Sequence, residues 1–305
     1  EQDSRHYARA AKVPMLEPSD SQEALEFTRL GFEVSEKFDK PVFVRTTTRI
    51  SHSKSIVTPG EPVNGLPEPA LEKDPPKFVM LPGNARKRHY VVEEQLEALS
   101  EWSCSQAFNR IEERSSSVGV ITAGIAYQYT REVLPEASVL KLGMVYPLPK
   151  RLIRNFAAKY ETLYVIEELE PFIEEQVKAM GIEVIGKDRL SICGELTPGR
   201  VSKALLDQEV PAHYAPEIEL PPRPPNMCPG CPHRGVFYAL NRLKAFVTGD
   251  IGCYTLGFMP PLSAMDTCVC MGASVGNATG LNKVLEGEEK QKVVGVIGDS
   301  TFLHT

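Results

Sequence analysis

Short apolar strands alternate with helical segments through the middle of the chain, and this alternation constrains the fold more than any other feature. Strands that alternate with helices form parallel sheets whose faces the helices cover. The expected strands are 117–122, 138–145 and 162–166, and the expected helices are 91–114, a segment ending near 136, 150–160 and 171–180. The pattern therefore predicts a parallel-sheet α/β fold, with one complete domain at 89–210.

Residues 1–58 contain one expected helix and one expected strand, which are too few to enclose a core. The helix begins near Ser19 or Ser21, either of which can cap it, with Glu23 in the first turn. The strand covers 41–46 and is short and apolar. We therefore expect this region to be the last part of an α/β domain whose beginning precedes the chain.

Two proline-rich segments separate the expected domains. Residues 59–88 combine proline, glycine and charge, which is typical of a linker, and residues 211–227 hold six prolines, which favour an extended connector. A further α/β region begins at Cys228 and reaches an apolar strand at 293–297, close to Thr305. A buried strand of a parallel sheet needs a following helix to cover it. We therefore expect the 305 residues to be a segment of a longer polypeptide.

The charge balance narrows the classes of partner. The chain has 34 Lys and Arg against 40 Asp and Glu, a net charge of −6, so it lacks the basic surface that nucleic acid requires. No apolar run reaches the roughly 20 residues that cross a bilayer, and we expect no signal peptide. Seven cysteines, an odd number without an extracellular context, argue against a disulfide framework. We expect a soluble cytoplasmic protein that binds neither nucleic acid nor membrane.

A Cys-Pro-Gly-Cys-Pro-His sequence runs from Cys228 to His233, and Cys253 follows it. The Pro-Gly bend folds the backbone so that the thiols of Cys228 and Cys231 can share one ligand. The spacing fits a zinc knuckle completed by His233 or Cys253, and it also fits an iron–sulfur cluster that takes a fourth thiolate from elsewhere. A thiol redox pair at the start of a helix near Pro232 and a plain turn with buried thiols are the other interpretations.

A second pattern places Gly298, Asp299 and Ser300 after the strand at 293–297. Open α/β sheets bind ligands at the carboxyl ends of their strands. A glycine there lets a phosphate approach the backbone, and an aspartate offers an oxygen ligand to a Mg²⁺ ion that holds a diphosphate. The alternative is an ordinary turn, which Asp and Ser favour through local hydrogen bonds.

Six stretches in order resemble the alpha subunits of indolepyruvate:ferredoxin oxidoreductases, within the thiamine-diphosphate-dependent 2-oxoacid:ferredoxin oxidoreductase family. They are LEPSDSQEA from Leu16, RTTTR from Arg45, EELEPF from Glu167, CPGCPHR from Cys228, DIGCY from Asp250 and GDSTF from Gly298. The resemblance covers nearly the whole chain, and the last three stretches are specific in this order and spacing.

The resemblance implies an identity for each region. Residues 1–58 would be the C-terminal part of the domain that binds the aminopyrimidine ring of thiamine diphosphate. Residues 89–210 would be a transketolase C-terminal-like domain, and residues 228–305 the N-terminal part of the diphosphate-binding domain. The segments 59–88 and 211–227 would be linkers between them.

The resemblance also implies cofactors and their contacts. Asp299 would bind Mg²⁺, and a [4Fe–4S] cluster would take Cys228, Cys231 and Cys253 as ligands. The residues implied to border thiamine diphosphate are Ile251, Gly252, Cys253, Tyr254, Gly298, Ser300 and Thr301. No catalytic residue is expected within the chain, because the glutamate that activates the aminopyrimidine would precede Glu1 and the fourth cluster cysteine would follow Thr305. The 305 residues alone are therefore expected to be inactive.

The implied activity is the ferredoxin-dependent oxidative decarboxylation of an aryl 2-oxoacid, indolepyruvate, to the acyl-CoA. The implied partners are a beta subunit of the same enzyme, ferredoxin, the 2-oxoacid and CoA. The alternatives are an oxidoreductase of this family for another 2-oxoacid, and a non-catalytic binding subunit stabilised by zinc.

Overall fold

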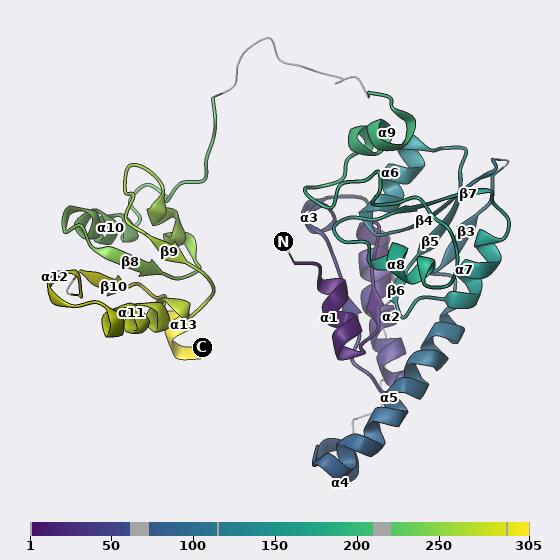
Figure 1. Cartoon of the computed structure of the whole chain (residues 1–305), viewed down its shortest axis with the longest axis horizontal. Helices are drawn as coiled ribbons and strands as arrows, with labels where there is room; N and C mark the ends of the chain where they lie inside the picture. The colour runs from purple at the N-terminus through teal and green to yellow at the C-terminus, as the bar shows by residue number, and fades with distance from the viewer. Residues whose placement is uncertain (1, 62–72, 115, 210–220, 291, 305) are drawn as a thin grey trace. The chain divides into compact units, whose positions relative to one another are not determined.

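The computed structural model describes residues 2–61, 73–114, 116–209, 221–290 and 292–304. The contacts divide the chain into two compact units, unit 1 within residues 1–213 and unit 2 within residues 214–305 (Figure 1). Residues 62–72 of the first predicted linker and residues 211–220 of the second lie outside the described residues. The assignment of particular domains to 1–58, 89–210 and 228–305 stays a prediction.

Unit 1 contains a four-stranded sheet in the order β3-β5-β4-β7. Its strands are β3 (Arg110–Glu112), β4 (Val118–Ala123), β5 (Ser138–Leu142) and β7 (Thr162–Ile166). β4 pairs in parallel with β5 and β7, while β3 pairs antiparallel with β5 at one edge. This arrangement confirms the parallel-sheet α/β fold expected from the alternation of strands and helices.

Helices cover both faces of this sheet. They are α6 (Ile125–Val133), α7 (Lys150–Ala157), α8 (Phe172–Lys178) and α9 (Pro198–Leu206). Ile121 packs with α7 and α8, and its neighbour Val120 packs with α6 and α9, because successive residues of a strand point to opposite faces. The sequence prediction lacked α9, although Thr197 caps it and Pro198 occupies its first turn, both of which are signals of a helix start.

The N-terminal elements form a second sheet in the order β2-β1-β6. The elements are α1 (Ser4–Ala11), β1 (Met15–Leu16), α2 (Ser21–Phe38), β2 (Phe43–Val44), α3 (Thr48–His52) and β6 (Met144–Tyr146). β1 pairs in parallel with β2 and antiparallel with β6, so this sheet joins the beginning of the chain to its middle. The cap of α2 is Asp20, which accepts from the Glu23 N–H at 2.8 Å, and the expected cap at Ser19 or Ser21 is wrong.

Buried ion pairs also join the N-terminal elements to the larger sheet. Lys141 of β5 donates to Glu23 of α2, and Arg5 of α1 donates to Glu167 at 2.5 Å. All four side chains are buried. Because a buried charge is costly without its partner, these pairs fix how the two sets of elements pack together.

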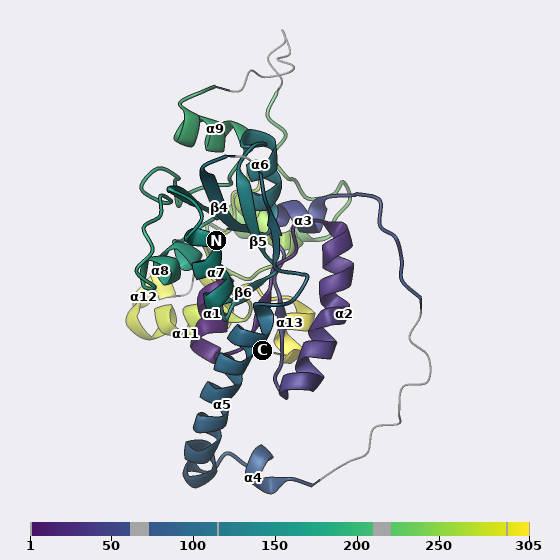
Figure 2. The same cartoon turned by 90° about the vertical axis from the view of Figure 1, so that its right-hand side faces the viewer.

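The helix expected at 91–114 lies earlier in the chain. It is α5 (Pro82–Ser103), which has a proline in its first turn and ends before β3. Figures 1 and 2 show α5 extending away from the sheets, with the short helix α4 (Pro75–Phe78) near its outer end.

The strand expected at 138–145 is divided into β5 and β6 at Gly143. The side-chain oxygen of Asn109 accepts from the backbone N–H of Gly143 at 2.8 Å and from that of Met144 at 3.1 Å. Asn109 thus accepts the N–H groups at the boundary between the two strands. β5 pairs within the larger sheet, and β6 pairs with β1 in the smaller one.

Unit 2 contains a parallel sheet in the order β10-β8-β9. Its elements are α10 (His233–Arg242), β8 (Phe246–Gly249), the 3-10 helix η1 (Cys253–Phe258), β9 (Thr267–Cys268), α11 (Ala273–Val284), α12 (Gly287–Lys290), β10 (Val293–Gly295) and α13 (Asp299–His304). Its core is small and gathers Met227, Phe237, Val247 and Ala264. Across the described parts of both units, every helix is too short or too polar to cross a membrane.

Candidate functional site

The three parallel strands of unit 2 end at one edge of their sheet. The loop after β8 begins with Asp250, the loop after β9 leads to Gly272, and the loop after β10 carries Gly298 and Asp299. Open α/β sheets bind ligands at such an edge. The two motifs that the sequence predicts to approach a cofactor, which are far apart in the chain, therefore lie at the same edge.

Asp250 connects the first two of these loops. Its side chain is fully buried, and its Oδ1 accepts from the backbone N–H of Ile251 at 2.8 Å and from that of Gly272 at 2.9 Å. Gly272 precedes α11 with a φ of 83°, a conformation that glycine adopts without strain. Burial alone would raise the pKa of Asp250, but the N–H donors outweigh it and lower the pKa. Asp250 is thus an ionised anchor that holds the start of α11 beside the end of β8.

Tyr254 connects the third loop to this anchor. Its hydroxyl group donates to Asp250 Oδ2 at 3.3 Å. Burial and the negative charge of Asp250 raise the pKa of the Tyr254 hydroxyl. A Cβ atom at Gly298 would lie 2.8 Å from the same hydroxyl oxygen, so only glycine fits there without a shift of the ring. The glycine of the Gly-Asp motif therefore lets the Tyr254 hydroxyl group pack closely against this loop.

The residues after Gly298 differ in their exposure to solvent, and therefore in whether a ligand could contact them. Asp299 is the first residue of α13 and is exposed, and its Oδ1 accepts from the Ser300 N–H at 2.8 Å. Ser300 is exposed as well, whereas Thr301 is buried. In the loop after β8, the predicted residues Ile251, Gly252 and Cys253 are all exposed. The edge therefore offers an exposed carboxylate and an exposed hydroxyl group beside an accessible backbone.

Residues Cys228 to Cys231 form a tight turn. The Cys231 N–H donates to the Cys228 carbonyl at 3.1 Å, and Gly230 has a φ of 75°. Proline at the second position and a glycine of positive φ at the third are the features of a type II turn. Helix α10 begins directly afterwards, at His233. The bend predicted from the Pro-Gly pair is confirmed.

A series of contacts leads from this turn to the sheet edge. Cys231 Sγ lies 3.2 Å from His233 Nδ1, and the His233 ring lies 5.5 Å from the Tyr254 ring, measured between their centres. Cys253 precedes Tyr254 and is exposed. Among the described residues, no three His, Cys, Asp or Glu side chains are grouped so that they could hold a metal ion. The structure brings Cys231 to His233 but does not gather Cys228, Cys231 and Cys253 around one point.

The role of Asp250 was not predicted from the sequence, which indicated residues 251–254 but not the aspartate before them. The signal was present, because an aspartate directly after a buried strand lies at the carboxyl edge of the sheet. What the sequence cannot show is that the backbone N–H of Gly272, in a distant loop, is its partner.

The region that forms this edge matches a known family. Residues 250–305 match the family model "Thiamine pyrophosphate enzyme, C-terminal TPP binding domain", and thiamine pyrophosphate is the same compound as thiamine diphosphate. The indolepyruvate oxidoreductase subunit IorA of Thermococcus kodakarensis is 41% identical, with 100% of this chain and 54% of that protein covered. The IorA subunit of Archaeoglobus fulgidus is also 41% identical, with 100% of this chain and 52% of that protein covered. The chain spans about half the length of these curated relatives.

One solved structure is similar at a lower level. It is the 2-oxoglutarate:ferredoxin oxidoreductase from Magnetococcus marinus, which matches 64% of this chain and 42% of its own at 16% identity, with a TM-score of 0.43. A TM-score this low does not establish a shared arrangement of the whole chain.

Proposed function

Because the chain belongs to the family of indolepyruvate oxidoreductase IorA subunits, we propose that it forms part of an enzyme that oxidises an aryl 2-oxoacid with thiamine diphosphate. The proposed substrate is indolepyruvate, after which the relatives are named. Ferredoxin as electron acceptor, CoA as acyl acceptor and a beta subunit as partner complete the proposal. The activity is proposed for the enzyme that contains this chain, since the chain spans about half of its relatives.

The convergence of three loops at the sheet edge carries this proposal. Asp250, Gly272 and Gly298 lie within the region that matches the thiamine pyrophosphate-binding family, and hydrogen bonds or close packing connect them. The exposed Asp299 and Ser300 fit a diphosphate held through a metal ion, because Mg²⁺ binds diphosphates through one or two carboxylates.

Each residue of the edge has a proposed part in holding the cofactor. Asp299 would bind Mg²⁺, and Ser300 would donate its hydroxyl hydrogen to a diphosphate oxygen. Asp250 fixes the start of α11, whose first N–H groups and positive end favour a negative ligand at this edge. Thr301 is buried, so its proposed part is to support the loop from within the unit.

The chemistry itself belongs to the cofactor. Bound thiamine diphosphate supplies the electron sink that a 2-oxoacid needs in order to lose its carboxyl group, which side chains lack. The residues of this chain hold the diphosphate, shape the surface beside it and keep its charge compensated.

Iron–sulfur ligation is a separate part of the proposal. Cys228 and Cys231 lie in one tight turn, so this pair fits two ligand positions of a [4Fe–4S] cluster. Cys253 is exposed but is not grouped with them, and it is proposed as a third ligand on the resemblance alone. No part of the proposed cofactor binding depends on the cluster.

The variant Asp299→Ala, in the enzyme purified with its partner subunit, tests the diphosphate site. Loss of the proposed Mg²⁺ carboxylate should weaken retention of thiamine diphosphate by about 10- to 100-fold, the range known for metal sites that lose even an outer-shell group. The measurement is the amount of thiamine diphosphate that co-elutes with the protein at increasing Mg²⁺, together with turnover of indolepyruvate and CoA.

Glu288→Ala is the matched control, because it removes an exposed carboxylate from the same unit, away from the edge. It should leave cofactor content and turnover unchanged. Unchanged cofactor retention in Asp299→Ala would contradict the assignment of Asp299. An enzyme that contains zinc without iron and retains no thiamine diphosphate would instead support the zinc-stabilised binding subunit.

A further inference from the structure

The N-terminal half of α5 extends away from the sheets of unit 1, as Figures 1 and 2 show. The helix has 22 residues, so it is about 33 Å long. No residue of α5 before Leu96 is buried. Most helices in proteins are stabilised by packing one face against another element, and exposed apolar groups mark surfaces that contact other molecules. Such groups lie directly before α5, where four successive apolar side chains are exposed, namely Phe78, Val79, Met80 and Leu81.

The solvent side of α5 carries a continuous stripe of exposed residues, which we call the outward stripe. Its members are three or four positions apart, and residues at this spacing lie on one side of a helix. The stripe lies opposite the residues that α5 buries, Leu96, Leu99 and Ser103. It runs along the whole helix and consists of Gly83, Lys87, Tyr90, Glu94, Ala98 and Glu101.

Charges along α5 are in the order that its own dipole disfavours. The positive end of a helix dipole is at the N-terminus and favours acidic residues there, while the negative end favours basic residues. The first turn of α5 has no acidic residue and the last turn has no basic one. Instead, residues 86–88 in the first half are basic, and the acidic residues follow in the second half, at 93, 94, 97 and 101. An isolated helix gains nothing from this order, whereas two antiparallel copies would place each basic half beside an acidic half.

Two charges of the outward stripe have no partner within the chain. Lys87 and Glu94 form no ion pair or hydrogen bond with the residues that the structure describes. Lys87 has no charged residue three or four positions away, and Glu94 has only the like-charged Glu97. Glu101, the third charge of the stripe, pairs with Arg151 of α7 at 2.5 Å. The charges of Lys87 and Glu94 are therefore available to a second molecule.

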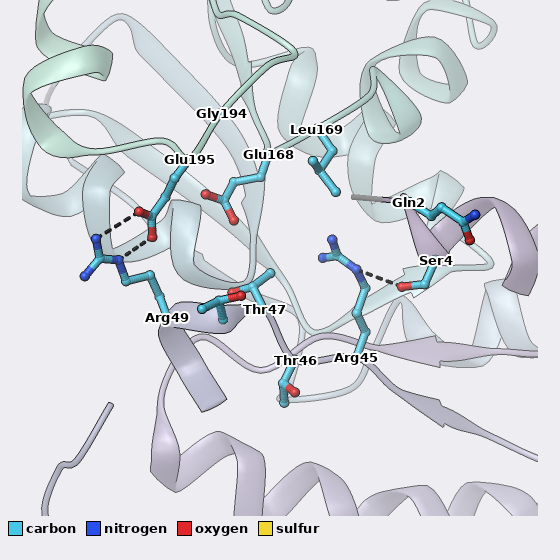
Figure 3. A pocket seen from close by; sticks show the side chains of 11 residues that line it. Gln2, Ser4, Arg45, Thr46, Thr47, Arg49, Glu168, Leu169, Gly194 and Glu195 are labelled. Carbon is cyan, nitrogen blue, oxygen red and sulfur yellow. Dashed lines mark hydrogen bonds and ion pairs between the residues drawn. The ribbon is translucent and has the colours of Figure 1, made fainter. Parts of the chain in front are cut away.

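Charges at another exposed place of unit 1 show the contrast. Figure 3 shows a cavity of about 560 Å³ that Arg49, Glu168 and Glu195 line together with other residues. Arg49 and Glu195 are both exposed, yet they form an ion pair with each other. The surface of unit 1 thus compensates exposed charges there and leaves them uncompensated on α5.

We propose that the outward stripe of α5 binds the same stripe of a second copy of this chain. The two helices would be antiparallel, with the two-fold axis near Tyr90, whose side chain is 70% exposed. Lys87 of each copy would then lie beside Glu94 of the other, so each contact occurs twice, as in any two-fold interface. The exposed apolar residues 78–81 would lie beside the C-terminal half of the other α5.

Other occupants match the outward stripe less well. A polyanion or an anionic membrane surface would be repelled by Glu94 and Glu101, which lie on the same stripe as Lys87. An acidic protein would leave Glu94 beside a like charge. A surface that carries both signs in the reverse order matches the stripe, and the stripe of an antiparallel second copy is such a surface.

This inference concerns α5 of unit 1 and does not rest on the proposed function, which concerns the sheet edge of unit 2. Its failure would leave the cofactor proposal untouched. Its readout is the contact between two copies rather than activity, so the two proposals can be judged separately.

Cross-linking in the full-length protein that contains this chain tests the contact. Tyr90→Cys places a thiol near the proposed axis, and mild oxidation should then join two copies about tenfold faster than in the parent protein, because thiols held together in a complex have a high effective concentration. The parent protein accounts for the seven natural cysteines. Glu136→Cys, at an exposed position outside α5, is the matched control. Equal yields of covalent dimer from Tyr90→Cys and Glu136→Cys would overturn the proposal.

Charge reversal in the Tyr90→Cys protein tests the antiparallel arrangement. Lys87→Glu or Glu94→Lys turns two attractive contacts into repulsive ones, so each should slow cross-linking about 5- to 30-fold at low salt. When a Lys87→Glu copy and a Glu94→Lys copy with different tags are co-expressed, every contact between them joins opposite charges, and they should cross-link to each other at the original rate.

Two results of the charge reversals would overturn the proposal. One is cross-linking of the single variants as fast as that of Tyr90→Cys alone, or a co-expressed pair that stays slow. The other is a Lys87→Glu protein that cross-links normally but loses a different protein subunit from the purified complex, because the outward stripe would then bind that subunit.

Discussion

The Lys141 side chain is completely buried in unit 1, where its ammonium group donates to Glu23 and lies 4.8 Å from the centre of the Phe27 ring. Burial lowers the pKa of Lys141, and Glu23 opposes that effect. Glu23 also accepts from the N–H and the hydroxyl group of Ser19, each at 2.8 Å. Burial alone would raise the pKa of Glu23, but Lys141 and these hydrogen bonds lower it. The charge on each of these two buried side chains is therefore stabilised by the opposite charge on the other.

The variant Lys141→Met should destabilise unit 1 by about 3–5 kcal/mol, because it leaves the buried Glu23 carboxylate without its main counter-charge. Urea unfolding followed by the fluorescence of Trp102, the single tryptophan of the chain, measures this change. Trp102 packs against Phe38 at the end of α2, so it reports on the contact that the pair stabilises.

The same variant should change how stability depends on pH. The pKa of Glu23 in the folded protein lies below its ordinary value of 4.5, so its stabilising contribution is present above pH 4.5 and is lost as the pH falls through the folded value. Without Lys141 the folded pKa of Glu23 rises, so the loss of stability on acidification is smaller and Glu23 is destabilising at neutral pH.

Lys159→Met is the control for this pair. Lys159 and Glu113 form an ion pair in which both side chains are exposed, and such pairs contribute little to stability. A shift in the unfolding midpoint of Lys141→Met no larger than that of Lys159→Met would mean that the buried pair is not needed.

At the scale of elements, local signals predicted those elements whose limits are set by residues close to them in the sequence. The strand at 162–166 is β7 with the same limits, and the Pro-Gly bend at Cys228–Cys231 is a type II turn. Elements that depend on distant partners were predicted less well. The expected strand at 138–145 is interrupted because the Asn109 side chain takes the N–H groups at Gly143 and Met144, which no pattern within the strand reveals.

The variant Gly230→Ala tests the turn as an element. A Cβ atom at this position would meet no atom within 4 Å, so the only cost is the positive φ of 75°, about 1–2 kcal/mol for a residue other than glycine. This cost should open the turn and speed hydrogen exchange at the Cys231 amide by about 5- to 30-fold. Exchange measured amide by amide reports it.

Gly235→Ala is the matched control, since Gly235 lies within α10, also has open space around it, and has no positive φ. Alanine favours a helix over glycine, so exchange in α10 should stay equal or become slower. Equal exchange at Cys231 in both variants would show that the turn tolerates a side chain.

At the scale of the whole molecule, the middle region relies on the N-terminal elements. Met144 is fully buried in a cluster with Leu16, Phe27 and Val34, and β6 pairs with β1. The alternation of strands and helices predicts that residues 89–210 form one complete domain. A piece of residues 89–210 would lose these contacts with Leu16, Phe27, Val34 and β1, and would expose Met144 and the free edge of β6.

A piece of residues 89–210 should therefore fail to unfold cooperatively, whereas residues 1–210 should give a single transition. Removal of the first segment exposes the Met144 cluster and leaves Lys141 buried without Glu23. Near-ultraviolet circular dichroism during urea unfolding of both pieces makes the comparison. A cooperative transition of 89–210 at the midpoint of the longer piece would show that the middle region is an independent domain.

The sequence by itself determined the α/β class, the parallel sheets, the Pro-Gly turn and the Gly-Asp pair after the strand at 293–297. These features depend on periodicity and on turn residues, which act over a few positions of the chain. Only the tertiary structure decided that Asp250 reaches Gly272, that Glu23 neutralises Lys141, and that Arg45 and Glu168 face one cavity. The physical reason is that burial and electrostatic pairing depend on which distant segments meet, and strand pairing and core packing set those meetings.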